Sequence, residues 1–274
     1  MELIDRLDRD RLSVLTGVIV LAMALARFME TPSRPLSTTI LGSTAGVNLS
    51  AATLAPLLIG GLGITAAESL IRSHPLARSG RISRTAIYWI IPGLISLALA
   101  SWLISVENLG LWTAGIIVSA ILVPVALAAE YLSIGPSVKK RIILQWGQRL
   151  LVYLVALILF TRIFDWRART ILSGTAVLFV AAILAARLYW MILADRANTI
   201  LYGLVAGILL GQLTWVLNYW PLSSLQGGVI LLITFYLIVG LTEQFLAGRL
   251  TRQVTVEHVS LALIGLLLVA AVVP

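Results

Sequence analysis

VNLSAATLAPLLIGGLGITAAESLI, residues 47–71, carries a single charged side chain, Glu68. About twenty consecutive apolar residues allow an α-helix to cross a hydrocarbon core roughly 30 Å thick. A helix suits that environment because it satisfies its backbone hydrogen bonds internally. The stretch therefore predicts a membrane-spanning helix, and it leaves open what a carboxylate does near the end of it.

The composition of the whole chain extends this prediction to all 274 residues. Hydrophobic residues make up 59% of the chain and charged residues 12%, and the mean hydropathy is +1.00. Soluble domains carry about 25% charged residues. The charges here fall between apolar stretches, so no stretch is left over for a soluble domain. We expect an all-α, polytopic transmembrane helix bundle that forms a single integral membrane domain over residues 1–274.

The apolar stretches predict nine spans. They are expected at residues 12–28, 47–71, 85–105, 109–132, 149–164, 171–194, 198–218, 227–247 and 256–273. Eight spans remain an alternative, because 149–164 is short enough to lie partly outside the membrane. Residues 1–11 are expected to form a short cytoplasmic amphipathic segment through Leu3, Ile4 and Leu7.

Basic residues indicate the orientation, because cytoplasmic loops are enriched in Lys and Arg. With the N-terminus in the cytoplasm, fifteen of the 20 basic residues fall inside and five outside, and the C-terminus lies outside. The expected location is a bacterial-type inner or cytoplasmic membrane. The net charge of +8 is assigned to these loops and to anionic lipid, so nucleic acid is not an expected partner.

A short pattern recurs at the expected inner helix ends. ITAAESL (64–70), ALAAEYL (126–132), LAARLYW (184–190) and VGLTEQF (239–245) align Glu68, Glu130, Arg187 and Glu243 at separations of 62, 57 and 56 residues. This period favours four repeated helical hairpins followed by one C-terminal helix. The alternative is chance, since apolar helices nearing the cytoplasm often acquire a charge and an aromatic residue.

The four aligned residues predict an inner charged layer, in which Arg187 pairs with the carboxylates and fixes the order of the helices. Pairing lowers the cost of placing charge near the membrane. A proton or cation site open to the cytoplasm is the functional alternative, and side chains that extend to the interface without a role are a third.

Two further sets of residues are candidates for function. Gly203, Gly207 and Gly211 form a glycine stripe beside Gln212, which predicts close helix packing or a groove for a lipid, isoprenoid or pigment tail. Helix-breaking residues occur in the second to fourth spans, and such breaks build substrate sites in some transporters. These residues are Pro56, Pro92, Gly93 and Pro124.

The inventory of chemical groups argues against catalysis. The chain has no cysteine and two histidines, His74 and His258, which are too few for a three-ligand zinc cluster. Both are expected near the inner surface, so they do not form an intramembrane pair for bis-histidine haem. P-loop and metalloprotease motifs are absent. No cofactor is predicted beyond a bound lipid, and an enzyme acting on a lipid-linked substrate is the least favoured class.

We therefore expect a non-catalytic membrane protein that serves as a structural or accessory subunit of a larger assembly, with membrane lipid and other membrane protein subunits as partners. The alternative is a transporter or lipid-handling carrier that uses kinked second to fourth helices and the inner carboxylates.

Overall fold

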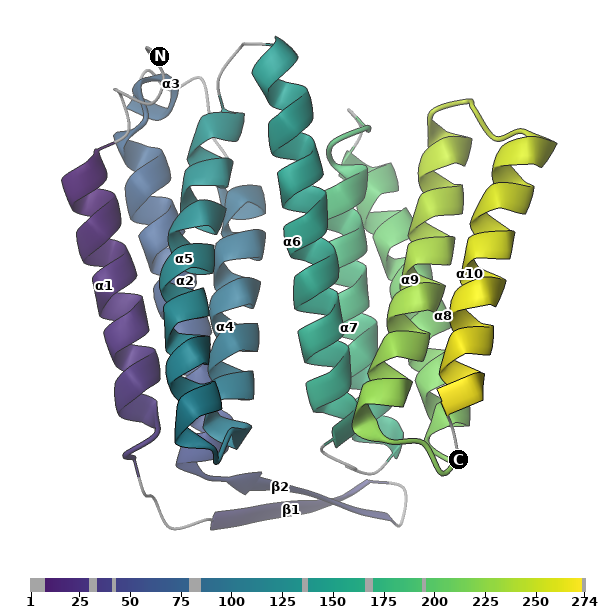
Figure 1. Cartoon of the computed structure of the whole chain (residues 1–274), viewed down its shortest axis with the longest axis horizontal. Helices are drawn as coiled ribbons and strands as arrows, with labels where there is room; N and C mark the ends of the chain where they lie inside the picture. The colour runs from purple at the N-terminus through teal and green to yellow at the C-terminus, as the bar shows by residue number, and fades with distance from the viewer. Residues whose placement is uncertain are drawn as a thin grey trace. The chain divides into compact units, whose positions relative to one another are not determined.

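The computed structural model describes residues 8–29, 34–40, 43–78, 85–134, 138–165, 170–193 and 196–272. Over these residues the chain is helical apart from one β-hairpin (Figure 1). It divides into two compact units, Met1–Leu151 and Val152–Pro274. The boundary falls within one long helix, α6 (Val138–Asp165).

Besides the start of α6, the first unit contains helices, a short 3-10 turn and two strands, in the following chain order: α1 (Arg9–Ala26), β1 (Arg34–Ile40), β2 (Ser43–Leu49), α2 (Ala51–Ser73), α3 (Pro75–Arg78), η1 (Ala86–Trp89), α4 (Ile90–Ser105) and α5 (Leu109–Ser133). The second unit contains the rest of α6 and four more helices: α7 (Thr170–Tyr189), α8 (Arg196–Leu217), α9 (Ser224–Leu246) and α10 (Arg252–Val272).

Eight helices of the described residues are long and apolar enough to cross a membrane. They lie at Ala52–Ser73, Ala86–Ser105, Leu109–Ser133, Ile143–Asp165, Ile171–Tyr189, Ala197–Leu217, Ser224–Leu246 and Arg252–Ala271. The expected transmembrane helical fold is confirmed at this level. The fifth span, expected at 149–164, is longer than predicted: it covers residues 143–165 and has 23 residues.

The β-hairpin was not expected from the sequence. β1 and β2 pair antiparallel, with Arg34 opposite Leu49 and Ile40 opposite Ser43. The span expected at 47–71 therefore begins later, at Ala51, because residues 47–49 belong to β2. Of the amphipathic segment expected at 1–11, residues 1–7 lie outside the described residues, and α1 already begins at Arg9.

α1 is attached to its neighbours at both ends. Near its start, Arg11 Nη1 donates to the carbonyl of Ser69 at 3.4 Å. At its end, the guanidinium of Arg27 donates to the carbonyls of Val106 and Glu107, each at 2.9 Å. Since Ser69 is near the end of α2 and Val106 follows α4, α1 runs antiparallel to α2 beside the spanning helices (Figure 1).

Small residues bring α2 and α4 together in the first unit. A Cβ added to Gly63 would lie 2.5 Å from the carbonyl oxygen of Pro92, and one added to Gly93 would lie 2.6 Å from Ile64 Cγ1. Only glycine allows two helices to approach this closely. The contact continues at Gly60, where an added Cβ would meet Leu97 at 3.0 Å.

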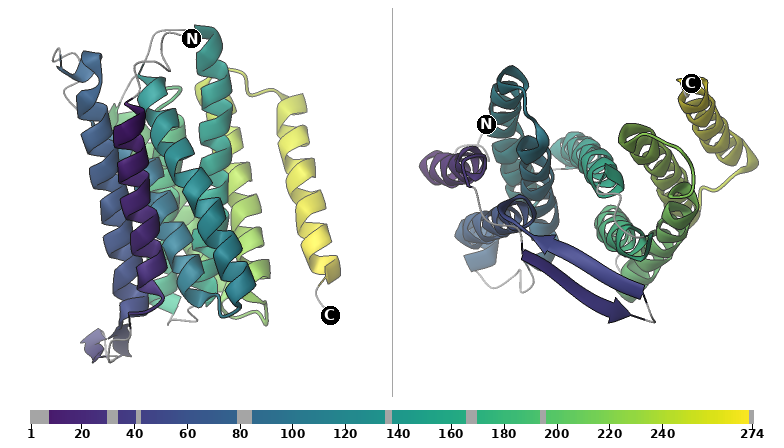
Figure 2. Two further views of the ribbon diagram at one scale, coloured as in Figure 1. Left: turned by 60° about the vertical axis from the view of Figure 1, so that its left-hand side comes forward. Right: turned by 90° about the horizontal axis from the view of Figure 1, so that it is seen from below.

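In the second unit, α9 lies between α6 and α10 in the packing. On one side Phe235 of α9 meets Phe160 of α6, with ring centroids 5.9 Å apart. On the other, Tyr236 stacks on His258 of α10 at 5.6 Å. Gly248 then ends α9 with a φ of 65°, a left-handed conformation that favours glycine and terminates helices. Figure 2 shows α10 as the last helix of this unit.

Candidate functional site

The four residues of the inner charged layer differ in exposure. Glu130, Arg187 and Glu243 are 1%, 3% and 7% exposed, respectively, so protein encloses them. The side chain of Glu68 is 19% exposed. Glu68 and Glu130 belong to the first unit, and Arg187 and Glu243 belong to the second.

Glu68 joins α2 to the start of the next span. Its Oε1 accepts a hydrogen bond from Arg72 Nε one turn later, and its Oε2 accepts one from Trp89 Nε1 at 2.7 Å. The cation bound to Glu68 is therefore Arg72, a neighbour on the same helix. The pairing with Arg187 that the sequence suggested would join the two units and stays a prediction. Because Trp89 closes η1, the carboxylate ties the end of α2 to the entry of α4.

Glu130 lies in a group of buried polar side chains in the first unit. Its neighbour Tyr131 meets the ring of His74 edge to face, with centroids 4.8 Å apart. Gln148, the eleventh residue of α6, is 2% exposed, and its Nε2 lies 3.5 Å from the carbonyl oxygen of Ala129. The end of α2, the end of α5 and the first half of α6 thus meet at this polar group.

Buried polar and charged side chains also lie near the ends of α7 and α9 in the second unit. Tyr189 of α7 is fully buried, and its hydroxyl lies close enough to Thr242 and Glu243 of α9 to interact with them. Arg187 is two residues before Tyr189 on the same helix. A cation, a carboxylate and a phenol are therefore buried where α7 and α9 end.

The glycine stripe of α8 faces α7. A Cβ added to Gly203 would lie 2.8 Å from the carbonyl oxygen of Ala182, one added to Gly207 would lie 2.5 Å from that of Leu178, and one added to Gly211 would lie 3.0 Å from that of Gly174. α7 of the same chain thus occupies this face. No lipid or pigment tail has room between the two backbones.

Gln212 lies on a different face of α8 and is exposed. It lies five positions before the end of the helix at Leu217, which places it about 7.5 Å from that end at 1.5 Å per residue. Within the described residues its amide has no hydrogen-bond partner. Its exposed neighbours on α8 are apolar, and they include Ile208, Leu209, Trp215 and Val216.

The expected helix breaks leave the helices continuous. Pro56 lies inside α2 and Pro124 inside α5, and each helix runs through its proline. Pro92 is the third residue of α4, where a backbone N–H has no partner within the helix in any case. Gly93, beside it, packs against Ile64 of α2. The second to fourth spans therefore contain no interrupted helix of the kind that builds transporter sites.

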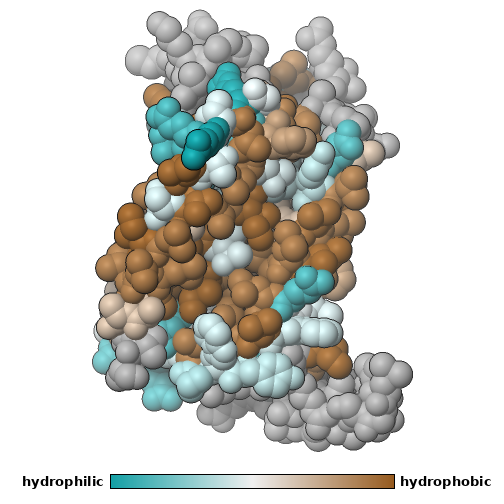
Figure 3. Space-filling model, turned by 90° about the vertical axis from the view of Figure 1, so that its right-hand side faces the viewer, coloured by the Kyte–Doolittle hydropathy of each residue, from teal (hydrophilic) through white to brown (hydrophobic). Residues whose placement is uncertain are grey.

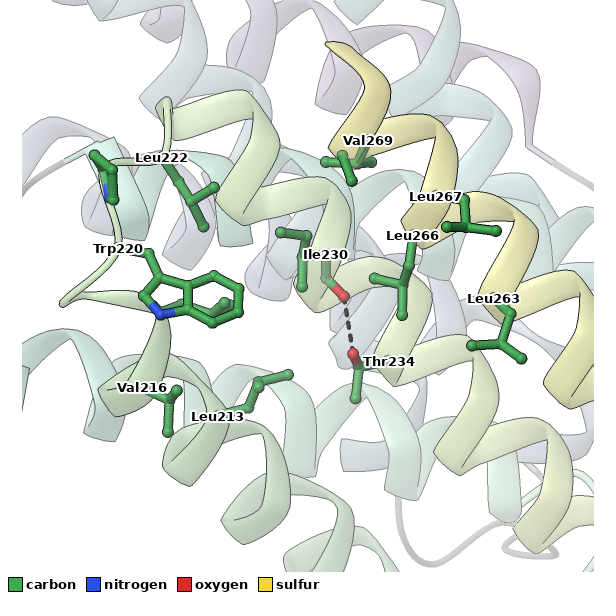
Figure 4. Close-up of a pocket in the computed structure, with 13 residues that line it drawn as sticks. Leu213, Val216, Trp220, Leu222, Ile230, Thr234, Leu263, Leu266, Leu267 and Val269 are labelled. Carbon is green, nitrogen blue, oxygen red and sulfur yellow. Dashed lines mark hydrogen bonds between the residues drawn. The ribbon is translucent and has the colours of Figure 1, made fainter. Parts of the chain in front are cut away.

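An apolar cavity of about 660 Å³ is present in the second unit between α8, α9 and α10 (Figure 4). Its lining is almost wholly hydrocarbon: Leu213, Val216, Leu217, Trp220, Pro221, Leu222, Ile230, Thr234, Leu263, Leu266, Leu267, Val269 and Ala270. The one hydroxyl, that of Thr234, donates to the carbonyl of Ile230 at 2.9 Å. Sequence reasoning missed this cavity, since its residues are ordinary apolar residues on three separate helices.

The face that Figure 3 shows carries a broad hydrophobic band, with hydrophilic residues toward the two ends. Such a band is expected of a surface that meets lipid. Among the described residues, no group of three or more His, Asp or Glu side chains is placed to hold a metal ion.

Comparison with known proteins yields one match. The family model described as "Protein of unknown function (DUF5656)" matches residues 31–272. No curated protein and no solved structure matches the chain. The family match extends from before β1 to the end of α10, so it includes both units, and the chain therefore belongs to the DUF5656 family.

Proposed function

We propose that this chain is a non-catalytic, structural or accessory subunit that binds a membrane-spanning helix of another subunit. The docking face is the outward face of α8, consisting of Ile208, Leu209 and Gln212. Trp215, which packs on Gly174 of α7, and Val216, which lines the apolar cavity, lie at its edges. The observation that carries the proposal is the exposed amide of Gln212 within a spanning helix. Lipid tails offer such an amide no hydrogen bond, whereas a polar side chain on a neighbouring helix does.

The proposed partner is a helix that presents an amide or hydroxyl side chain at the depth of Gln212. An interhelical hydrogen bond of this kind contributes about 0.6–2 kcal/mol in membranes, and packing of the apolar neighbours adds to it. A second feature supports a role in assembly. Only 6% of the α10 span is buried, against 28–50% for the other candidate spans, so α10 offers a further exposed face.

The test is crosslinking in native membranes through the docking face. The chain has no cysteine, so Ile208→Cys provides a unique attachment point for a photoreactive crosslinker. We expect one discrete adduct to a second membrane protein, which Gln212→Leu weakens. Tyr219→Leu, an exposed residue just after α8, is the control. A chain that is only monomeric in mild detergent and yields no adduct would contradict the proposal, and so would an adduct to itself alone.

We also infer that the two units arose by duplication of four helices, α1, α2, α4 and α5 corresponding to α6, α7, α8 and α9. Three features support this. The middle pairs, α2 with α4 and α7 with α8, are both packed through glycines. The outer helices also pack together, α1 with α5 and α6 with α9. Glu130 and Glu243 then occupy equivalent helix ends, and α10 is left over. An experimental structure whose two units do not superimpose helix for helix would reject the duplication.

The alternative function, a transporter or lipid-handling carrier, has less support in the form expected from the sequence. α2 and α4 are sealed together through Gly60, Gly63 and Gly93, and no helix there is interrupted. The buried carboxylates Glu130 and Glu243 are the features that favour it. Unchanged proton or cation flux in vesicles carrying a Glu130→Gln, Glu243→Gln variant would remove it.

A further inference from the structure

We propose that the apolar cavity between α8, α9 and α10 binds an acyl chain of a membrane phospholipid. The proposal goes beyond a role in assembly, because it concerns a lipid that this chain would hold by itself. It is argued from the chemistry of the lining, from the depth of the cavity and from the side chains at its end.

The lining selects hydrocarbon. Leucines from α8 and α10 face each other across the cavity, and α9 supplies Ile230 and Thr234 between them (Figure 4). The Thr234 hydroxyl is already bonded to the carbonyl of Ile230, which leaves the indole N–H of Trp220, at the end of the cavity, as the other side-chain donor of the lining. A ligand that needs hydrogen bonds would lose those it makes in water. An acyl chain loses none.

The volume is large enough for a substantial ligand. Pockets of about 300–1,000 Å³ are typical of small-molecule sites, and this cavity measures about 660 Å³. An empty apolar cavity forfeits the dispersion contacts of its walls. Since α8, α9 and α10 are all candidate spans, the medium beside this cavity is the lipid bilayer itself.

The end of the cavity indicates a phospholipid among the possible hydrocarbon ligands. The cavity reaches Trp220, Pro221 and Leu222, in the connection between α8 and α9. This connection follows a span and therefore lies near the membrane surface. Trp220 is 57% exposed and its neighbour Tyr219 is 82% exposed. Exposed Trp and Tyr side chains at that depth lie at the level of lipid headgroups. An acyl chain can thus enter the cavity while its headgroup stays at the interface.

The first test uses the unaltered protein. The full chain is reconstituted in phosphatidylcholine vesicles that contain a phosphatidylcholine with a photoactivatable diazirine on one acyl chain. After irradiation and digestion, we expect adducts concentrated on peptides of α9 and α10 that contain Thr234 and Leu266. Labelling spread evenly over all exposed helix faces would overturn the proposal, because that is the pattern of bulk lipid.

The second test fills the cavity. In Leu213→Phe, Leu266→Phe, one larger side chain enters from α8 and one from α10. We expect native mass spectrometry of the detergent-extracted protein to show about a tenfold lower lipid-bound fraction, in keeping with the 10- to 200-fold effect of a methylene misfit in an apolar pocket. The control is Leu261→Phe, Leu268→Phe, which enlarges exposed residues of α10 outside the lining.

The mass of the retained molecule identifies it. A phospholipid that persists in the control and is lost from the filled variant supports the proposal. An isoprenoid or a detergent molecule alone would overturn it, and so would equal phospholipid retention in both variants. If the filled variant does not fold, the photolabelling pattern of the unaltered protein still decides.

Discussion

Single glycines allow α7 and α8 of the second unit to pack closely. We predict that Gly207→Ala destabilises the protein by about 1–3 kcal/mol, the usual cost of overpacking. The added Cβ would lie 2.5 Å from the carbonyl oxygen of Leu178 and 2.8 Å from Ala182 Cβ, so α7 and α8 must separate. Thermal unfolding in detergent measures the effect.

Gly61→Ala is the matched control, because nothing lies within 4 Å of the Cβ that it would add to α2. Alanine is the better helix former by up to about 1 kcal/mol, so this variant should be unchanged or more stable. Equal destabilisation of both variants would show that the glycines matter for flexibility and not for the α7–α8 contact.

At the level of residues, the sequence indicated which charged side chains belong to spanning helices, but it did not predict the residues that these side chains contact. Glu68, Glu130, Arg187 and Glu243 stood out because charge is rare inside apolar stretches. The Trp89 donor to Glu68 could not be predicted, since it is 21 residues away and depends on how the chain re-enters the membrane. The cavity had no signal at all, because a leucine that lines a hollow and a leucine that faces lipid are identical in sequence.

At the level of elements, α1 depends on polar contacts at its ends. We predict that Arg27→Ala loosens the C-terminal half of α1, because it removes two hydrogen bonds to the carbonyls of Val106 and Glu107 and the stacking of the guanidinium on Trp112 at 5.1 Å. Bonds from a charged donor contribute roughly 1.5–3 kcal/mol each when shielded from water, and less at this partly exposed site.

Hydrogen–deuterium exchange checks this prediction, with faster exchange expected for the amides of α1 near Arg27. Arg9→Ala is the control, since Arg9 is an exposed residue of the same helix with no side-chain hydrogen bond among the described residues. Unchanged exchange in Arg27→Ala would mean that the apolar face of α1, with Ile19 and Met23 buried, suffices to hold it.

Helices were easier to predict than the hairpin because the apolar runs that form them are long. Each span is set by about twenty apolar residues, and an error of a few residues at either end changes little. The strands are seven residues each and lie in a polar, Thr-rich segment that offers no long apolar signal. The extra length of α6 was missed for a related reason: its first turns are basic and polar, and the helix continues through them.

At the level of the whole molecule, the decisive question is whether α1 crosses the membrane. Eight helices qualify by length and composition, and α1 does not, because its first turn adds Arg9, Asp10 and Arg11 to an 18-residue helix. Its contacts argue for a crossing. Arg11 reaches the end of α2 and Arg27 reaches the connection after α4, so α1 extends along the same depth as two spanning helices. We therefore propose nine spans, with the N-terminus inside and the C-terminus outside.

Cysteine labelling tests this topology on a chain that has no cysteine of its own. Four exposed positions at helix ends receive single cysteines: Arg9→Cys, Glu107→Cys, Tyr219→Cys and Arg249→Cys. In intact spheroplasts, a membrane-impermeant maleimide should label the cysteines at 107 and 219, whereas those at 9 and 249 should react only after permeabilisation. Labelling at 9 together with 107 would show that α1 does not cross and that the spans number eight. Labelling at 9 and 249 alone would keep nine spans and reverse their orientation, so the bias of fifteen basic residues to five would lie on the outer side.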